Sequence, residues 1–137
     1  MVQTGVPFGE VEAARSFLSI ASGVRTPRVQ HPRRPVTGFD CTRSEVSGRR
    51  FWGLMSKEFG SPARFFRAGF VWNWCPLAFM AQSGANLTPD KLPRTGRGAT
   101  AVRALESACD TALGDAIRAL EPRAVVGFGA FAAERAK

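Results

Sequence analysis

One amide side chain stands out among the residues that could do chemistry. Asn73 lies inside the apolar run Phe70-Val71-Trp72-Asn73-Trp74-Cys75-Pro76-Leu77, whose residues favour a buried strand and whose proline ends it. A buried primary amide needs partners for both its N–H donor and its C=O acceptor. Uracil presents the matching edge, a carbonyl beside an N–H, whereas cytosine presents the reverse at one position. The alternative is an Asn that satisfies neighbouring backbone at a strand end, and both interpretations stay open.

Asn73 has to be positioned by regular elements on either side of it. Apolar side chains at helical spacing predict helices at residues 10–21, 44–59, 100–120 and 130–137, the second of them capped by Ser44. Short apolar runs predict buried strands at residues 65–75 and 124–129. A polar turn is expected to start at Thr88-Pro89. The aromatic residues of 44–59 are expected in the core.

This order of elements predicts a fold class. Helices alternating with strands indicate an α/β protein, a three-layer α/β/α sandwich with a central parallel sheet, incomplete within these 137 residues and built as one domain over 1–137. Ligands bind at the carboxyl ends of parallel strands. Asn73 is therefore expected at such an end, where the glycine-rich loop carrying Phe8 would have to meet it. From the residues alone, Phe8 is expected to be a core residue that follows a turn.

The charge of the chain favours a polyanionic partner. The formal net charge is +8 and the isoelectric point is about 11, which suits nucleic acid, although a basic protein without such a role has the same composition. Residues 24–43 are rich in proline and arginine and predict a surface loop, either a phosphate-contacting rim or a solvated connection. His31 in this loop is the single histidine of the chain and is expected to be a bystander.

Several other classes of protein are disfavoured. The three cysteines, Cys41, Cys75 and Cys109, form no Cys-x-x-Cys pair, so no zinc site or disulfide framework is expected, and a reducing compartment is the default. Cys75 and Cys109 are expected as small core residues. No apolar run approaches the roughly 18 residues of a membrane span, and no signal peptide is visible.

Five motifs together, in the same order, resemble the single-strand-selective monofunctional uracil-DNA glycosylases. They lie at residues 1–11, at Ser44-Glu45-Val46-Ser47-Gly48 with Phe51-Trp52-Gly53, at Phe70 to Leu77, at Asn86-Leu87-Thr88-Pro89, and at Val125-Val126-Gly127. The resemblance covers essentially the whole chain, and several motifs in register are far more specific than one.

The resemblance implies roles for individual residues. The residue matching Phe8 stacks on a uracil flipped out of DNA, the residue matching Asn73 hydrogen-bonds its imide edge, and the residue matching Met1 lines the uracil pocket. The segment 83–97 matches a DNA-contacting segment, although it also fits an ordinary polar loop. The DNA contacts implied within it are Ser83, Gly84, Asn86, Thr88, Lys91, Arg94 and Arg97.

The resemblance also implies an activity and a gap. The family excises uracil, and uracils with small polar groups at C5, from single- or double-stranded DNA by N-glycosidic hydrolysis in base-excision repair. It implies a monomer in the nucleus, with no metal or organic cofactor and no membrane. The family's Asn-Pro-Gly motif would precede Met1, and its His-Pro-Ser-Pro motif would follow Lys137, so none of the catalytic residues falls within this chain. By itself the chain is expected to be weakly active or inactive, like the middle of such an enzyme.

Two further functions remain open. The first is a non-catalytic remnant that binds nucleic acid, which the charge and the absent catalytic pair favour. The second is a branch of the same superfamily that is directed at mismatched bases.

Overall fold

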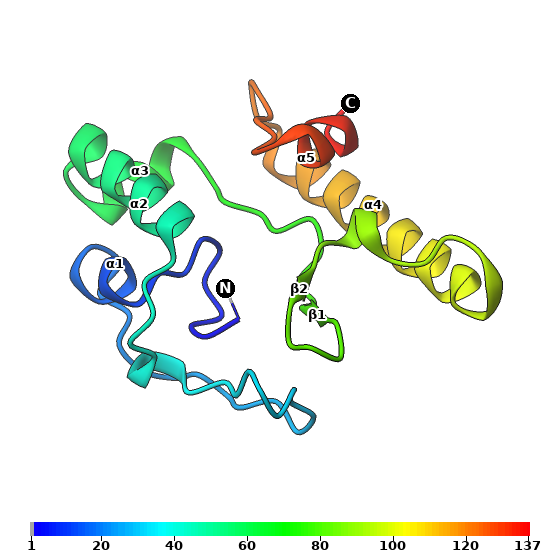
Figure 1. Cartoon of the computed structure of the whole chain (residues 1–137). Helices are drawn as coiled ribbons and strands as arrows, with labels where there is room; N and C mark the ends of the chain where they lie inside the picture. The colour runs from blue at the N-terminus through cyan, green and yellow to red at the C-terminus, as the bar shows by residue number, and fades with distance from the viewer. Residues whose placement is uncertain (1) are drawn as a thin grey trace. The chain divides into compact units, whose positions relative to one another are not determined.

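The computed structural model of the protein describes residues 2–137, which divide into two compact units, unit 1 up to Val71 and unit 2 from Trp72 to Lys137. Unit 1 contains three helices, α1 (Val11–Ser16), α2 (Val46–Phe59) and α3 (Pro62–Ala68), and α2 contacts both of the others (Figure 1). The sequence predicted α2 closely. It ends at Gly60, whose backbone is left-handed at φ 70°, a conformation that favours glycine.

Aromatic side chains form the core of unit 1. The buried cluster consists of Phe17, Leu18, Phe51, Trp52 and Phe65. Trp52 is only 1% exposed, and its ring meets those of Phe51 and Phe65 edge to face, with centroids 4.8 Å and 5.7 Å away. Such pairs contribute beyond their buried area, so the aromatic stripe of α2 anchors its neighbours. The expectation that these residues form core is confirmed.

Two boundaries in unit 1 differ from the sequence prediction. The helix predicted to run to residue 21 ends at Ser16, because Ser19 takes a left-handed backbone and the Leu18 and Ile20 amides turn back to the Ala13 and Ala14 carbonyls. Ser44 was expected to cap α2, but the N-cap is Glu45, and the Ser44 hydroxyl instead donates to the Glu10 carboxylate at 3.1 Å.

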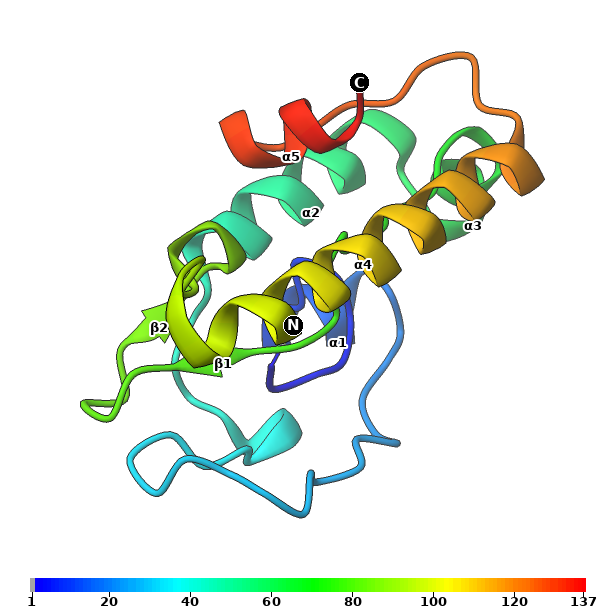
Figure 2. The same cartoon turned by 90° about the vertical axis from the view of Figure 1, so that its right-hand side faces the viewer.

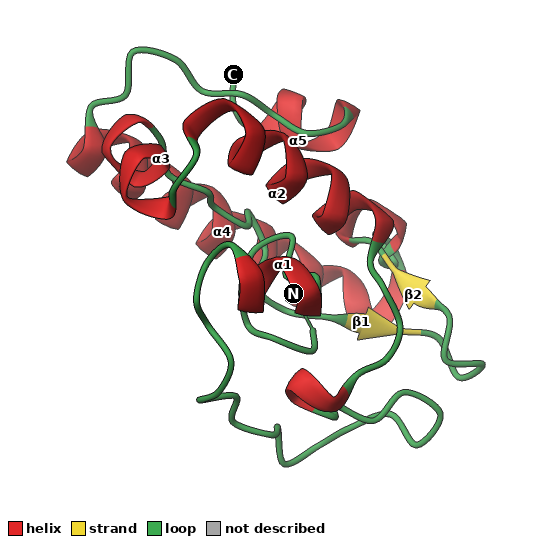
Figure 3. Cartoon of the chain, turned by 90° about the vertical axis from the view of Figure 1, so that its left-hand side faces the viewer, coloured by secondary structure: helices red, strands yellow, loops and turns green. Residues whose placement is uncertain are grey.

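The Pro- and Arg-rich stretch has no regular structure through residues 24–37, as predicted, and is drawn as an extended loop in Figure 3. We call residues 24–37 the arginine loop. It leads into a short 3-10 helix, η1 (Gly38–Asp40). Within the loop, residues 31–34 form a tight turn, in which the Arg34 amide donates to the His31 carbonyl at 2.8 Å.

Unit 2 begins with an extended segment and a small hairpin. Strands β1 (Phe79–Met80) and β2 (Asn86–Leu87) pair antiparallel, with Phe79 opposite Leu87 and Met80 opposite Asn86 (Figure 2). Two 3-10 helices follow, η2 (Pro89–Lys91) and η3 (Gly96–Gly98), then the long helix α4 (Ala99–Leu120) and the short helix α5 (Ala130–Arg135). The turn predicted at Thr88-Pro89 and the two helices predicted after it are confirmed.

The two predicted strands are wrong. Residues 65–68 belong to α3, which is started by Ser61, whose side chain accepts from the Arg64 amide, and by Pro62 in its first turn. Residues 69–78 are extended without a ladder partner, and residues 124–129 are irregular. Strand-favouring residues form a strand only where a partner offers a pleated surface. Within residues 2–137 the sheet is the β1–β2 pair alone, so the structure is mixed helix with a two-stranded sheet, and the parallel sheet is not found there.

None of the helices in residues 2–137 is both long enough and apolar enough to cross a membrane.

Candidate functional site

The loop that carries Phe8 is held by hydrogen bonds from three directions. The Thr4 hydroxyl donates to the Gly9 carbonyl at 3.1 Å, and the Trp52 indole donates to the Pro7 carbonyl at 3.1 Å. The Phe8 carbonyl accepts from the Glu10 amide at 2.8 Å. Because Thr4, Glu10 and Trp52 are buried, these bonds are shielded from water and fix the path of the loop.

Phe8 itself has a strained backbone. Its φ is 51°, in the left-handed region that a bulky side chain rarely occupies. Two glycines make this conformation possible. A Cβ on Gly9 would lie 1.9 Å from Thr4 Oγ1, and a Cβ on Gly48 would lie 2.2 Å from the Phe8 carbonyl oxygen. Strain of this kind persists only where surrounding contacts over-determine it, and it concentrates at functional sites.

The Phe8 ring is half-buried and stacks on Phe51, with centroids 4.6 Å apart and an angle of 20° between the rings. The core therefore supports one face of Phe8, which bears out its interpretation as a packing residue. A supported ring is also a stiff stacking surface. Its role against a base remains a prediction.

Asn73 lies in unit 2, in the extended segment 69–78, and is half-buried rather than buried. The strand that was expected to enclose it has not formed. What holds this part of the chain is the next residue, Trp74. Its indole N–H donates to Asp110 of α4 at 2.7 Å, and its ring meets Phe131 of α5 edge to face at 5.0 Å.

An arginine completes this anchor. The Arg135 guanidinium lies 4.9 Å from the centroid of the Trp74 ring and 5.2 Å from that of Phe131. It also forms ion pairs with Asp110 at 2.8 Å and Glu106 at 3.0 Å. The cation–π contacts and ion pairs of Arg135 thus join Trp74 to α4 and α5. We call Trp74, Asp110, Phe131 and Arg135 the Trp74 anchor.

The thiols of Cys75 and Cys109 meet beside this anchor. Burial raises the pKa of the Cys109 thiol to about 11, and the neighbouring Cys75 thiol, which shares a hydrogen bond with it, and Asp110 act in the same direction. Arg135 opposes this shift. Cys109 is buried and Cys75 is half-buried, so Cys109 behaves as the expected core residue and Cys75 does so in part. Together with the Trp74–Asp110 bond, this contact ties two successive residues after Asn73 to α4.

Phe8 and Asn73 belong to different units, so their meeting at one ligand stays a prediction. Met1 lies outside the described residues. Within its own unit, each of the two residues is nevertheless positioned by nearby contacts. Phe8 stands on a pinned loop in unit 1, and Asn73 adjoins an anchored indole in unit 2.

The predicted DNA-contacting segment forms the β1–β2 hairpin and the connection to α4. The hairpin brings Ser83, Gly84 and Asn86 together. Gly84 is left-handed at φ 82°, and the Ser83 hydroxyl accepts from the Ala85 amide at 3.4 Å. Thr88 is the N-cap of η2, although its side chain makes no capping bond. The hairpin keeps these small polar residues at the surface or close to it, apart from the buried Gly84.

The three cations of this segment differ. The side chains of Lys91 and Arg97 are exposed and have no polar partner among residues 2–137. Arg94 instead donates a hydrogen bond from each of its terminal nitrogens to the Glu106 carboxylate, at 2.6 Å and 3.3 Å. Since Arg135 binds the same carboxylate, Arg94 belongs to the charge network that includes the Trp74 anchor. A phosphate would have to compete with Glu106 for Arg94.

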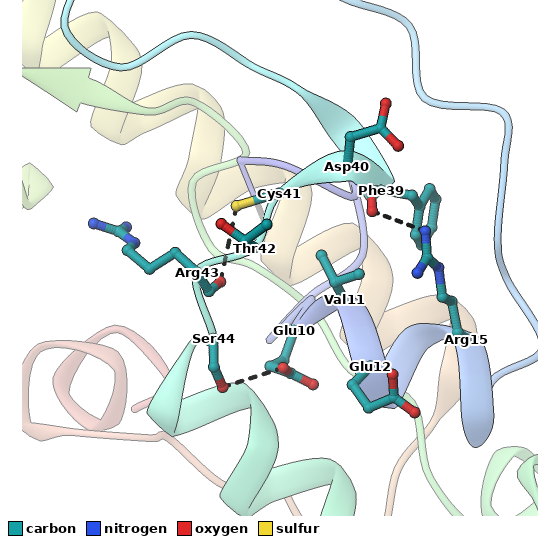
Figure 4. Close-up of a pocket in the computed structure, with 10 residues that line it drawn as sticks. All are labelled: Glu10, Val11, Glu12, Arg15, Phe39, Asp40, Cys41, Thr42, Arg43 and Ser44. Carbon is teal, nitrogen blue, oxygen red and sulfur yellow. Dashed lines mark hydrogen bonds between the residues drawn. The ribbon is translucent and has the colours of Figure 1, made fainter.

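A cavity of about 420 Å³ lies in unit 1 between α1 and the segment that precedes α2 (Figure 4). Its lining carries carboxylates from Glu10, Glu12 and Asp40 and guanidinium groups from Arg15 and Arg43. Glu10 accepts from the Ala13 amide and from Ser44, and Arg15 donates to the Phe39 carbonyl at 2.8 Å. Glu10 and Arg15 are therefore engaged in holding the chain together. Among residues 2–137, none of the predicted site residues lines the cavity.

Among the described residues, no group of His, Cys, Asp and Glu has the arrangement of a metal site. His31 is used locally, because its Nδ1 accepts from the Arg33 amide at 3.2 Å. The features that sequence reasoning missed are the strain at Phe8 and the Trp74 anchor. The glycines that flank Phe8 hinted at the first. The residues of the Trp74 anchor lie far apart in the sequence, and no motif or regular spacing connects them.

Comparisons with known proteins extend these observations. No protein-family model matches the chain. It is 50% identical over all of its 137 residues to the single-strand selective monofunctional uracil DNA glycosylase of Mus musculus, covering 47% of that protein. The proteins of the same description from Rattus norvegicus and Bos taurus are 50% and 48% identical over the same length, and the chain covers 48% of each. The resemblance seen in the motifs is confirmed, and the chain spans about half the length of the curated relatives it matches.

Proposed function

We propose that residues 1–137 form the base-recognising part of a DNA-repair glycosylase that hydrolyses the N-glycosidic bond of uracil in DNA. The observation that carries the proposal is the pinned, strained loop of Phe8, a pre-organised aromatic surface within a chain that is similar throughout to uracil-DNA glycosylases. We further propose that the protein acts in the nucleus as a monomer.

Two recognition steps follow from the proposal. Phe8, supported from behind by Phe51, stacks on a base flipped out of the helix, a contact that contributes about 1–3 kcal/mol and tolerates any base. Asn73 then supplies identity by pairing its amide with the imide edge of uracil. A site whose polar groups would be left unpaired rejects the wrong ligand by roughly 10⁴-fold. In this proposal Met1 also lines the base pocket.

The bound DNA is held by the hairpin segment. Ser83, Gly84, Asn86 and Thr88 allow the backbone to come close to the phosphates, and Lys91 and Arg97 supply charge. Arg94 joins them when a phosphate displaces Glu106. We propose that uracils with small polar C5 groups are accepted as well, in single- or double-stranded DNA.

Bond cleavage needs groups that this segment does not offer. As the glycosidic bond breaks, negative charge grows on the departing base and has to be stabilised. In the resembled family an Asn positions the attacking water and a His stabilises the departing uracil anion, and we propose that neither has a counterpart in 1–137. In a longer protein, flanking chain would supply these two residues, and it would also pair with the strand-favouring runs 69–78 and 124–129 to complete an α/β/α sandwich.

A chimeric protein tests the proposal. Residues 1–137 replace the matching segment of the mouse relative, and uracil release from single-stranded DNA is followed in single turnovers, with the unaltered mouse protein as positive control. The chimera is expected to release uracil. Asn73→Ala and Asn73→Asp are expected to lower the rate at least roughly 100-fold. The control, Gln82→Ala, changes an exposed amide in the same unit and should leave the rate unchanged.

Two results would overturn the proposal. A folded chimera that binds DNA but releases no uracil would favour a non-catalytic nucleic-acid-binding remnant. Unchanged rates and base preference in both Asn73 variants would remove Asn73 from the site.

A further inference from the structure

The basic charge of the protein is unevenly divided between its two units. Unit 1 has 11 Lys and Arg against 5 Asp and Glu, a net charge of +6, whereas unit 2 has 8 against 6, a net charge of +2. The hairpin segment proposed above to contact DNA lies in unit 2. Most of the excess charge therefore lies outside it, and a polyanion would be attracted more strongly to unit 1.

Within unit 1 the charge is concentrated in one stretch. No Asp or Glu occurs between Glu12 and Asp40, and the arginine loop lies inside this interval. Its arginines, at positions 25, 28, 33 and 34, are all exposed. The side chains of Arg25, Arg28 and Arg33 make no hydrogen bond or ion pair with other residues of the described 2–137. In unit 2, by contrast, Arg94 and Arg135 are held by carboxylates.

The loop is irregular, yet hydrogen bonds hold the backbone of its second half, residues 30–37. The Gln3 side chain accepts from the Thr37 and Gly38 amides at 2.8 Å and 3.0 Å, and donates to the Pro35 carbonyl at 3.1 Å. The Gln30 side chain closes the turn 31–34 by accepting from the Val36 amide at 2.7 Å.

Prolines add to this order. Pro27, Pro32 and Pro35 restrict the backbone further. A frame of this kind lowers the conformational entropy that the loop would lose on binding.

From these observations we propose that the arginine loop is a second DNA-binding surface, which contacts the sugar–phosphate backbone without reading bases. It rests on the proposed function only in taking DNA as the polyanion. Arginine side chains bind phosphate oxygens in a fork, and each phosphate neutralised releases counterions. The loop would add affinity to any DNA, while Asn73 would choose the base.

The salt dependence of DNA binding tests this proposal in the 137-residue chain. The probe is a uracil-free single-stranded oligonucleotide, so the result does not depend on excision. The triple variant Arg25→Gln, Arg28→Gln, Arg33→Gln is expected to bind at least about tenfold more weakly near 0.1 M salt. Its slope of log affinity against log salt concentration should be shallower by about 2, since single strands contribute about 0.7 per contact.

Two matched variants make the result specific. Arg103→Gln, Arg118→Gln, Arg123→Gln removes the same charge from exposed positions of unit 2 and should leave the slope nearly unchanged. The variant Arg25→Lys, Arg28→Lys, Arg33→Lys keeps the charge and should keep the salt slope of the unaltered chain. Equal losses of DNA affinity in the two triple glutamine variants would show that net charge alone acts. An unchanged salt slope in the arginine-loop variant would refute the proposed DNA-binding surface. Neither outcome bears on uracil excision, which the chimera tests separately.

Discussion

At the level of single residues, the position of Phe8 depends on a glycine, because any larger residue at that site would collide with the Phe8 loop. Gly48 lies in α2 where a Cβ would come within 2.2 Å of the Phe8 carbonyl oxygen and 2.9 Å of Glu10 Cβ. The helix itself gains nothing from a glycine there, since glycine costs about 1 kcal/mol relative to alanine in a helix interior. The close approach of the Phe8 loop explains its presence.

Substitution of this glycine should therefore destabilise the protein. Gly48→Ala forces the Phe8 loop away from α2 and is expected to lower the free energy of unfolding by about 1–3 kcal/mol. Gly53→Ala is the matched control in the same helix, because a Cβ there has no atom within 4 Å. It should raise stability by about 0.5–1 kcal/mol. Thermal unfolding followed by circular dichroism measures both, and two changes of the same sign would contradict the packing argument.

Cys109 makes stability depend on pH in the alkaline range. Its pKa is raised from 9.0 to about 11, so the folded state keeps a proton that the unfolded chain loses. The contribution to stability is therefore fully present below pH 9 and is lost as pH rises toward 11. Urea unfolding across this range should show a falling free energy in the natural protein and a flatter profile in Cys109→Ala. Parallel profiles would mean that other groups cause the fall.

At the level of elements, the extended segment 69–78 is ordered by helices instead of neighbouring strands. Trp74 donates to α4, packs against α5 and lies under the Arg135 guanidinium. Glu106 and Asp110 of α4 hold that guanidinium in place. Asn73 precedes this anchor directly. Any ligand that Asn73 binds would thus depend on Arg135, a positioning residue that need not touch the ligand.

Removal of the Arg135 charge tests the anchor. Arg135→Gln removes one partner from Asp110, which keeps the Trp74 indole, and one from Glu106, which keeps Arg94, and it is expected to lower stability by about 1–3 kcal/mol. The Trp74 indole N–H should exchange faster with solvent and shift in its proton resonance. Arg118→Gln is the control, since it removes an exposed pair with Asp115 in the same helix and should change neither. A Trp74 resonance that is unaltered in Arg135→Gln would show that the arginine does not position the indole.

At the level of the whole molecule, binding and catalysis are expected to separate. The net charge of +8 favours DNA, whereas the resemblance implies that the group which stabilises a departing base has no counterpart within 1–137. The 137-residue chain is expected to bind uracil-containing single-stranded DNA with an affinity that falls steeply with salt.

Uracil release by this chain should be slower than release by the chimera by roughly 10²-fold or more. A single-turnover assay on the same oligonucleotide compares the two proteins. Comparable rates would mean that the chemistry lies within 1–137, and His31 would then be the first residue to substitute. An affinity that stays flat from low to physiological salt would contradict the electrostatic part.

The sequence by itself determined the helices α2, α4 and α5, the irregular arginine loop, the aromatic core of α2 and the resemblance to uracil-DNA glycosylases. Periodicity, proline and glycine are local signals, and local interactions decide whether a helix starts and stops. The identity of Asn73 and Phe8 as candidates came from motifs, which need no coordinates.

The tertiary structure decided what depends on contacts between distant residues. The runs 69–78 and 124–129 have the composition of strands, but a strand exists only with a partner, and the described chain provides none for them. Likewise, nothing in their spacing links Trp74 with Asp110 and Arg135, or Gly48 with Phe8. Such contacts form when separate elements pack together. Only the folded chain therefore reveals that Gly48 lies against the Phe8 loop and that Arg135 lies over the indole next to Asn73.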